Sequence, residues 1–310
     1  MKKMSSWFAL FSYGMVVSLL VQSCSKNEEA LNPQSVSNSH LTAAGKTQPP
    51  PPADPAIAYE VRGNPDYIMV MNTDGSNQTA VTSGNCAIPS WSPDGHSIFF
   101  EGTFGGVSGF WIVDVAVVNG KVTSSNLRHV PITQPGTANG GRWSPLGDKI
   151  LFIFEDQNIY TIPPTGGTAT IVYTSPPGVS PFDPAWSPDG SKIVFTEWND
   201  AFTQSNLQVM DLTTLAITTV RPMTNVLIYG PTWSHHGDRI AYGGSGVQTV
   251  TPTANATPVN VTSGSLQTWS PDDSKFALTG GRKPAVESFT FAGGAINNLA
   301  SGTFADWRSF

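Results

Sequence analysis

Four glutamates are the residues whose type and position could support acid–base chemistry: Glu60, Glu101, Glu155 and Glu197. Glu60 and Glu101 each follow three apolar or aromatic residues and occupy the same position in two similar segments, and Glu155 lies close to that position in a third. Two carboxyl groups held about 5–10 Å apart can act as acid and base in the cleavage of a glycosidic bond. The alternative interpretation is that these glutamates are solvated ends of strands.

A short aromatic and acidic segment is a second candidate site. Glu197-Trp198-Asn199-Asp200 combines an indole with two carboxylates and an amide. This composition suits stacking against a sugar ring or holding a cationic group, so Trp198 and Asp200 join Glu197 as candidate ligand-binding residues. The alternative is a loop anchored by one half-buried tryptophan, because single aromatic residues in loops commonly pack locally.

Other catalytic chemistries have little support. The sequence has no Gly-x-Ser-x-Gly motif, which marks the nucleophile of α/β-hydrolases. It has only five histidines, and a catalytic metal normally requires three convergent ligands, so we predict neither a metal site nor a cofactor. We expect Cys86 to be a small buried hydrophobic residue. The sequence favours binding over catalysis and leaves open whether the protein is an enzyme.

A recurring five-residue motif indicates the fold that carries these candidate residues. Trp-Ser-Pro-Asp-Gly, or a variant of it, begins at six tryptophans: Trp91, Trp143, Trp186, Trp233, Trp269 and, in a degenerate copy, Trp307. Successive tryptophans are 36 to 52 residues apart, which is close to the length of a propeller blade. Proline and glycine favour a tight turn, and aspartate accepts hydrogen bonds from nearby backbone, so the motif predicts a hairpin turn and not an active site. His235-His236 replace Pro-Asp in one copy, which we interpret as decay of the repeat.

The repeat predicts an all-β protein, a six-bladed β-propeller over residues 57–310, with four strands, a to d, in each blade. Residues 57–60 resemble the strand that follows the motif, yet no motif precedes them. Trp307 resembles the first half of the motif, yet no strand follows it. We therefore predict that a C-terminal strand near 303–309 joins three N-terminal strands within 57–82 and closes the ring.

The two rims of such a propeller have different roles. The motif places the a–b turns on one rim, whereas the b–c and d–a loops form the other, where propellers usually bind ligands. These loops are predicted to include 101–109, 122–141, 174–185, 197–205 and 222–231. The residue before the repeat tryptophan is small in four copies, but is Arg142 or Asp306 in the other two. A charge beside the central channel predicts either a ligand contact or a salt bridge across the ring.

The N-terminal residues predict a targeting signal. Lys2 and Lys3 precede an apolar stretch of about 15 residues, which is shorter than a membrane-spanning helix. The stretch ends in Val21-Gln22-Ser23-Cys24, which resembles a bacterial lipobox. Residues 1–23 are therefore predicted to be a lipoprotein signal peptide and Cys24 the lipidated residue. The alternative is an ordinary signal peptide followed by a buried Cys24.

A tether is predicted after the lipidated cysteine. Residues 24–56 have few large apolar side chains and include Pro49-Pro50-Pro51-Pro52, so we expect them to be disordered and partly stiffened by proline. Residues 25–29, Ser-Lys-Asn-Glu-Glu, resemble the short acidic signals that send some Gram-negative lipoproteins to the cell surface. We predict a bacterial outer-membrane lipoprotein that faces either the periplasm or the cell surface.

Residues 57–310 resemble the propeller of the TolB family and its relatives, whose repeats carry the same Trp-Ser-Pro-Asp-Gly signature. The resemblance implies a propeller fold and leaves function open, because similar blades occur in periplasmic scaffold proteins, protease-associated propellers and some polysaccharide lyases. TolB itself resembles a two-domain protein with an N-terminal α/β domain, whereas a 32-residue tether precedes the blades here. The resemblance is thus to the propeller and not to TolB as a whole.

Composition excludes several classes of function. A formal net charge of −6 with only 16 lysines and arginines argues against nucleic-acid binding, and charged residues at 12% argue against a coiled coil. We expect a monomeric module, attached to the membrane by its lipid, that binds an envelope protein or a glycan at the b–c and d–a rim. The alternative is a glycosidase or lyase that uses the rim carboxylates.

Overall fold

The computed structural model describes residues 55–155, 157–280, 285–291 and 296–308. The predicted signal peptide, Cys24 and nearly all of the predicted tether lie outside these ranges. Within them the chain forms strands, turns and loops, and it contains no helix long and apolar enough to cross a membrane.

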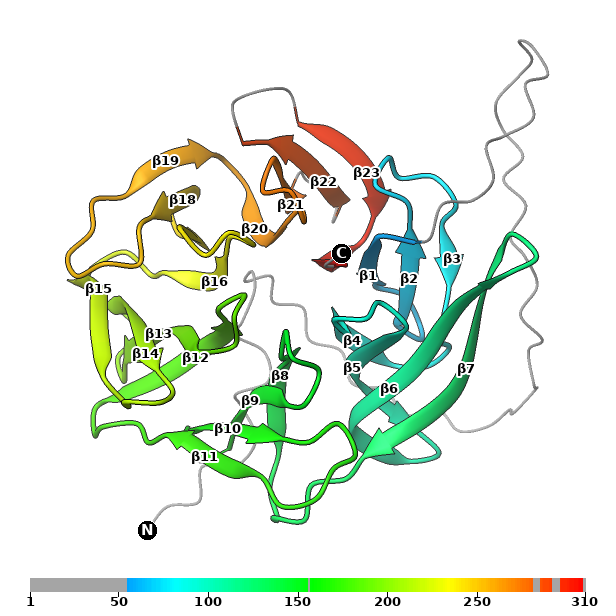
Figure 1. The fold of residues 1–310 in the computed structure, drawn as a ribbon, viewed down its shortest axis with the longest axis horizontal. Coiled ribbons are helices and arrows are strands. Elements are labelled where there is room, and N and C mark those ends of the chain that lie inside the picture. Colours follow the sequence, from blue (N-terminus) through cyan, green and yellow to red (C-terminus); the bar gives the residue numbers. More distant parts are fainter. Residues whose placement is uncertain (1–54, 156, 281–284, 292–295, 309–310) are drawn as a thin grey trace. The chain divides into compact units, whose positions relative to one another are not determined.

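Twenty-four strands form six four-stranded antiparallel sheets, the blades of a β-propeller (Figure 1). Within each blade, strands a to d follow one another from the centre of the ring outward. Blade 1 contains β24 (Thr303–Trp307), β1 (Ile57–Val61), β2 (Tyr67–Met71) and β3 (Thr79–Ala80). Blade 2 contains β4 (Cys86–Trp91), β5 (Ser97–Phe104), β6 (Val107–Val118) and β7 (Lys121–Val130). Blade 3 contains β8 (Ala138–Trp143), β9 (Ile150–Phe154), β10 (Ile159–Ile162) and β11 (Thr170–Tyr173). Blade 4 contains β12 (Val179–Trp186), β13 (Lys192–Asn199), β14 (Ser205–Asp211) and β15 (Ile217–Thr224). Blade 5 contains β16 (Tyr229–Trp233), β17 (Ile240–Gly243), β18 (Val247–Val250) and β19 (Val259–Thr262). Blade 6 contains β20 (Ser265–Trp269), β21 (Lys275–Gly280), β22 (Ala285–Thr290) and β23 (Asn297–Ser301).

The blades close into a ring around the six inner strands. Each inner strand contacts the inner strand of the next blade, including β20 with β24 and β24 with β4. The closure lies within blade 1, where β24 pairs with β1 and places Trp307 opposite Ile57. This confirms the predicted fold class, a six-bladed propeller whose C-terminal strand joins three N-terminal strands.

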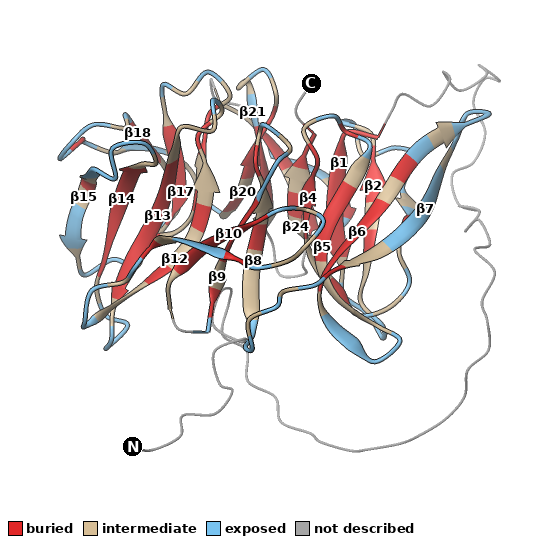
Figure 2. Cartoon of the chain, turned by 60° about the horizontal axis from the view of Figure 1, so that its bottom comes forward, coloured by how far each residue is buried: buried red, intermediate tan, exposed pale blue. Residues whose placement is uncertain are grey.

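The hydrophobic core is divided among six clusters, and each cluster joins two neighbouring blades. Between blades 1 and 2, for example, Ile68 and Val70 pack with Trp91 and Phe100. Figure 2 shows buried positions running through the strands and exposed positions concentrated in turns and outer strands. Both faces of a blade are covered, so the strand after each motif can be apolar at successive positions.

The repeat motif forms the a–b turn, as expected. In blade 2 the buried Ser92 donates a hydrogen bond to Asp94 at 2.6 Å, and Asp94 accepts the backbone N–H of His96 at 3.0 Å. Blades 3 and 5 lack aspartate at that position. There Asp148 and Asp238, two residues further on, accept the hydrogen bond of the buried serine at 2.8 and 2.9 Å.

The a–b and c–d turns form what we call the turn rim, and the b–c and d–a connections form the loop rim. Loops were expected over 101–109 and 122–141, but β5, β6 and β7 extend into these ranges as a long sheet. β7 is an outer strand with mostly exposed side chains, so its sequence is mostly polar and its few apolar residues do not alternate regularly with polar ones.

Candidate functional site

An irregularity recurs in the inner strands, three residues before the repeat tryptophan. Residues at this position have φ between +48° and +70° in five blades: Ile88, Gly140, Asp183, Gly230 and Phe304. The pairing of the inner strand with its neighbour shifts at each of them, which marks a β-bulge. A bulge interrupts the ladder of backbone hydrogen bonds and frees an N–H group for another partner.

Carboxylates of the preceding blade accept two of these freed N–H groups. Glu101 on β5 accepts that of Gly140 in β8, and Asp183 on β12 accepts that of the bulge residue in β16 at 2.9 Å. Asp306 on β24 similarly accepts the backbone N–H of Trp91 at 2.7 Å. One oxygen of each carboxylate is thus fixed across a junction between blades by a charge-assisted hydrogen bond.

Arg142 on β8 acts electrostatically on all three of these carboxylates. The carboxylates belong to blades 1, 2 and 4 and the guanidinium to blade 3, so the four charges converge inside the ring. His235 of blade 5 also acts on Asp306, across the intervening blade 6. Among the residues that the structure describes, no carboxylate lies within 4.0 Å of Arg142.

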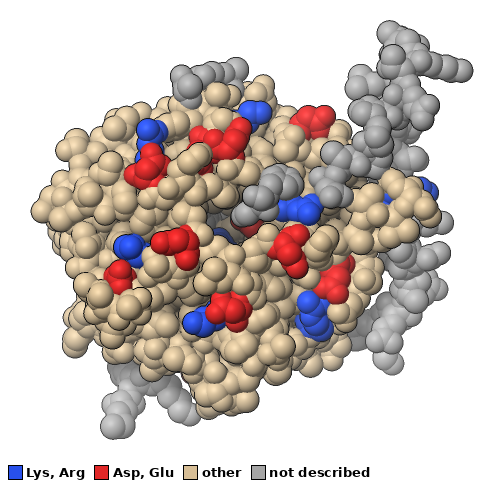
Figure 3. Space-filling view, viewed as in Figure 1, with Lys and Arg blue, Asp and Glu red and all other residues tan. Residues whose placement is uncertain are grey.

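We call the hollow enclosed by the inner strands the central channel, and Arg142, Glu101, Asp183 and Asp306 are its charged residues. All four are partly exposed, although they belong to inner strands or to the strand beside them. Figure 3 shows the molecule hollowed near the centre of the ring, with acidic and basic side chains around the hollow.

The carboxylates in the channel hold protons more tightly than carboxylates in water. Burial raises the pKa of Glu101 to about 7, although the Gly140 N–H and the charge of Arg142 act in the opposite direction. Burial also raises the pKa of Asp183 and of Asp306, again against the influence of Arg142. The single guanidinium does not offset the desolvation of three acids, so the channel can accept a further positive charge.

The structure brings together two of the four glutamates considered as acid and base. Glu60 acts electrostatically on Glu101, but it is 2% exposed and its carboxylate accepts a hydrogen bond from Arg62 at 3.0 Å. Burial raises the pKa of Glu60 as well. Glu155 is exposed on the loop rim, where it accepts the backbone N–H of Thr137 at 3.1 Å.

Glu197 lies apart from these residues, in the junction between blades 3 and 4. Its buried carboxylate accepts hydrogen bonds from the hydroxyl of Tyr173 and from the side-chain amides of Asn206 and Gln208, the latter two at 3.0 and 2.9 Å. Neutral donors inside the fold therefore stabilise this carboxylate, and it does not face a ligand on the loop rim.

Trp198 is buried next to Glu197. Its indole N–H donates to the carbonyl of Ile228 at 2.8 Å, and its ring lies 4.9 Å from Phe182 and 6.1 Å from Phe202, measured between centroids. Asp200 follows in the b–c loop of blade 4 and is exposed. Trp198 therefore packs locally, and Asp200 is the charged side chain that this segment presents to solvent.

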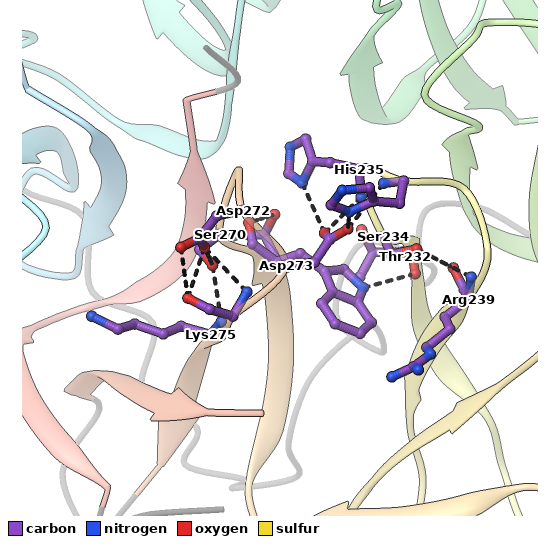
Figure 4. Close-up of polar contacts among 12 residues, drawn as sticks. Thr232, Ser234, His235, Arg239, Ser270, Asp272, Asp273 and Lys275 are labelled. Carbon is purple, nitrogen blue, oxygen red and sulfur yellow. Dashed lines mark hydrogen bonds and ion pairs between the residues drawn. The ribbon is translucent and has the colours of Figure 1, made fainter. Parts of the chain in front are cut away.

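A second polar cluster lies on the turn rim between blades 5 and 6 (Figure 4). Asp273 accepts the backbone N–H groups of His235 and His236 at 2.7 and 2.9 Å, and the Nδ1 atoms of the two imidazoles lie 3.3 and 2.5 Å from its carboxylate. The His-His dipeptide of the fourth motif therefore faces the aspartate that replaces glycine in the fifth.

Sequence reasoning missed the channel residue Asp183 and this turn-rim cluster. Asp183 would have been found by comparing the copies three residues before each tryptophan, where it is the one charged residue. The cluster would have been found by noting that two copies depart from the motif in ways that are chemically complementary.

Neither a metal centre nor a reactive thiol is found among the described residues. The described part of the chain contains no group of three or more His, Cys, Asp or Glu side chains that could hold a metal ion. Cys86 is buried and unpaired, and burial raises the pKa of its thiol to about 11. A thiol in this state is a poor nucleophile at neutral pH.

Comparison with protein-family models gives no match, and comparison with curated proteins gives none. Solved structures do resemble the propeller. TolB from Acinetobacter baumannii has a TM-score of 0.62 at 19% identity, over 84% of this chain and 68% of that one. A putative TolB from Agrobacterium tumefaciens has a TM-score of 0.56 at 17% identity, over 81% and 92% of the two chains. An oligogalacturonate lyase in complex with manganese has a TM-score of 0.50 at 17% identity, over 80% and 74%. At these identities the comparisons show the fold, a propeller like that of the TolB structures.

Proposed function

We propose that this protein is a lipid-anchored propeller of the bacterial envelope that binds a protein or glycan ligand at the loop rim and the adjoining central channel. The observation that carries the proposal is the separation of charge in the channel, where Arg142 faces three carboxylates without an ion pair. Charges held in a partly desolvated site without a close partner are costly, and a ligand with matching groups would relieve that cost. The likeness of the fold to TolB structures supports a place in the envelope.

Binding can be tested with glycan and peptide arrays probed with the purified full chain. We expect ligand capture by the unmodified protein and loss of that capture in Arg142→Gln, because the substitution removes the guanidinium. Lys121→Gln is the matched control, since it removes an exposed positive charge beside the c–d turn of blade 2, on the turn rim. Undiminished capture by Arg142→Gln would remove the channel from the proposal.

The anchor and its location form a separate part of the proposal. Lipidation at Cys24 rests on the lipobox-like residues 21–24 and would place the protein in the outer membrane, facing the periplasm or the cell surface. Labelling of expressing cells with palmitate should mark the wild-type protein and not Cys24→Ala. Labelling of the variant to the same extent would show that Cys24 is not the lipidated residue.

A second candidate function is cleavage of a carbohydrate, and one observation favours it. Glu101, with a pKa of about 7, could hold a proton at neutral pH and donate it to a leaving group, with Glu60 as the nearby second carboxylate. Incubation with glycans captured on the array, followed by analysis of the products, distinguishes the two functions. Turnover by the wild-type protein that Glu101→Gln abolishes would establish catalysis, whereas recovery of intact glycan would leave the binding function.

A further inference from the structure

The guanidinium of Arg142 has unused hydrogen-bonding capacity. One Nη atom donates to the carbonyl of Gly141 at 3.0 Å. Among the described residues, this is the only hydrogen bond of the Arg142 side chain. Arginine presents five N–H donors in a planar fork that matches a carboxylate. The guanidinium is thus free to bind a carboxylate, although it lies within electrostatic range of three acids of the protein.

The acids cannot easily move to meet it. Glu101 and Asp183 each have one oxygen hydrogen-bonded to the backbone of the next blade, and the other oxygen has no hydrogen bond among the described residues. Asp306 is held by the backbone of Trp91 in the same way. These backbone contacts therefore hold the acids in place, with no ion pair to Arg142 among the described residues.

This arrangement selects for a ligand with charges of both signs. A simple anion would pair with Arg142 but meet repulsion from the acids, and a simple cation would do the reverse. A ligand that carries a carboxylate and an ammonium group can pair with Arg142 and with the acids at the same time. Three acids face one arginine, so a ligand with more ammonium groups than carboxylates matches the charge of the site better than a neutral zwitterion.

We propose that the central channel binds a free diamino acid, with its carboxylate on Arg142 and its two ammonium groups on the acids Glu101, Asp183 and Asp306. This inference rests on the proposed binding function and names the class of ligand for the same site. Lysine is the simplest probe of that class.

The first test is calorimetric titration of the purified full chain at low ionic strength. L-lysine should bind more tightly than cadaverine, which lacks the carboxylate, and more tightly than 6-aminohexanoate, which lacks one ammonium group. Hexanoate, with the carboxylate alone, should bind weakest. An Ala-Ala-Lys peptide, whose C-terminal residue keeps the carboxylate but only the side-chain ammonium group, should also bind less tightly than L-lysine.

Variants assign the contacts. Arg142→Gln should weaken lysine binding about tenfold or more, the usual value of a charge-assisted contact, and should leave cadaverine binding unchanged or improved. Asp183→Asn keeps an acceptor for the Gly230 N–H but loses the charge, so it should weaken both ligands. Asp148→Asn, at an exposed acid of the turn rim, should weaken neither. Arg142→Lys keeps the charge but lacks the planar fork of donors, so its affinity for lysine should lie between those of wild type and Arg142→Gln. Circular dichroism establishes that each variant is folded.

Two results would overturn the inference: no lysine binding by the folded wild-type protein, or lysine binding that Arg142→Gln does not weaken. If lysine does not bind while array capture still depends on Arg142, the binding function stands and the diamino-acid assignment fails. If array capture does not depend on Arg142 either, both fail.

Discussion

Asp273 occupies a position where the other a–b turns have glycine, and it adopts the same left-handed backbone conformation, with φ of +55°. Its carboxylate compensates for that conformation by binding the turn of the neighbouring blade. Partial burial would raise the pKa of Asp273, but the backbone N–H groups of His235 and His236 hold it below its usual value. Conversely, the hydrogen bond to Asp273 raises the pKa of His236.

Asp273→Asn should therefore destabilise the protein in a pH-dependent way. The lowered pKa of Asp273 contributes stability above about pH 4, and that contribution is lost as pH falls. The raised pKa of His236 contributes stability below about pH 6.5, lost as pH rises through the folded pKa. The difference in melting temperature between wild type and Asp273→Asn should be largest between these values. His236→Gln should remove the fall in this difference above pH 6.5, and a difference that does not vary with pH would contradict the interpretation.

Glu101 should make the folded protein less stable as pH rises, in contrast to Asp273. Its pKa is about 7 in the folded protein against an ordinary value of 4.5, so the folded state binds the proton more tightly and loses stability as pH rises between them. Glu101→Gln keeps an acceptor for the Gly140 N–H and removes the titration. Relative to wild type, the variant should gain on the order of 1–3 kcal/mol between pH 4.5 and pH 8. Urea unfolding at both pH values measures the gain, and equal differences at both would show that the pKa of Glu101 is not raised in the folded protein.

At the scale of elements, the junction between blades 2 and 3 depends on a glycine. A Cβ atom on Gly141 in β8 would lie 2.2 Å from the ring of Phe99 in β5. Gly141→Ala should therefore cost about 1–3 kcal/mol of stability through overpacking. Phe99→Leu alone should also destabilise the protein, because it replaces a buried aromatic ring with a smaller side chain. The double variant should nevertheless be more stable than the sum of the two losses predicts. A double-mutant cycle from urea unfolding measures this coupling, and strictly additive losses would mean that the two positions do not touch.

The strands and turns were predictable because the same motif occurs in six copies along the sequence. A single Trp-Ser-Pro-Asp-Gly would indicate one turn, but recurrence at blade spacing fixes the number of strands, the fold and even the closure through Trp307. β7 was not predictable as a strand because an exposed outer strand needs no apolar side chains. Fold prediction thus succeeded where burial imposes a pattern.

The channel was harder to predict because its residues come from different columns of the repeat. Arg142 and Asp306 precede the tryptophan directly, Asp183 lies two residues earlier, and Glu101 is on the second strand. These residues converge because of the β-bulges and the arrangement of the blades in a ring. A single sequence does not predict either of these features in enough detail. Glu197 shows the converse, because its position after an apolar strand resembles that of the others, but neighbouring amides bind it inside a blade junction.

For the whole molecule, stability should depend strongly on the closing strand. Trp307 is 4% exposed and packs in the cluster between blades 6 and 1. Trp307→Ala should cost on the order of 3–5 kcal/mol, the usual range for truncating a buried aromatic side chain. Phe202→Ala, at a loop residue 37% exposed, should cost less. Thermal unfolding measures both, and removal of residues 303–310 without any loss of thermal stability would contradict the closure.

The closure in blade 1 also sets the order in which the molecule can be completed on the ribosome. Strands β1 to β3 leave the ribosome first, but the innermost strand of their blade is β24, which is made last. Until then the nascent chain has an open edge at β1, which proteases and other unpaired strands can reach. Asp306 arrives with the same strand, so the charges of the channel are complete only in a finished chain. A product terminated before β24 would therefore lack both the closing strand of blade 1 and one of the four charges of the channel.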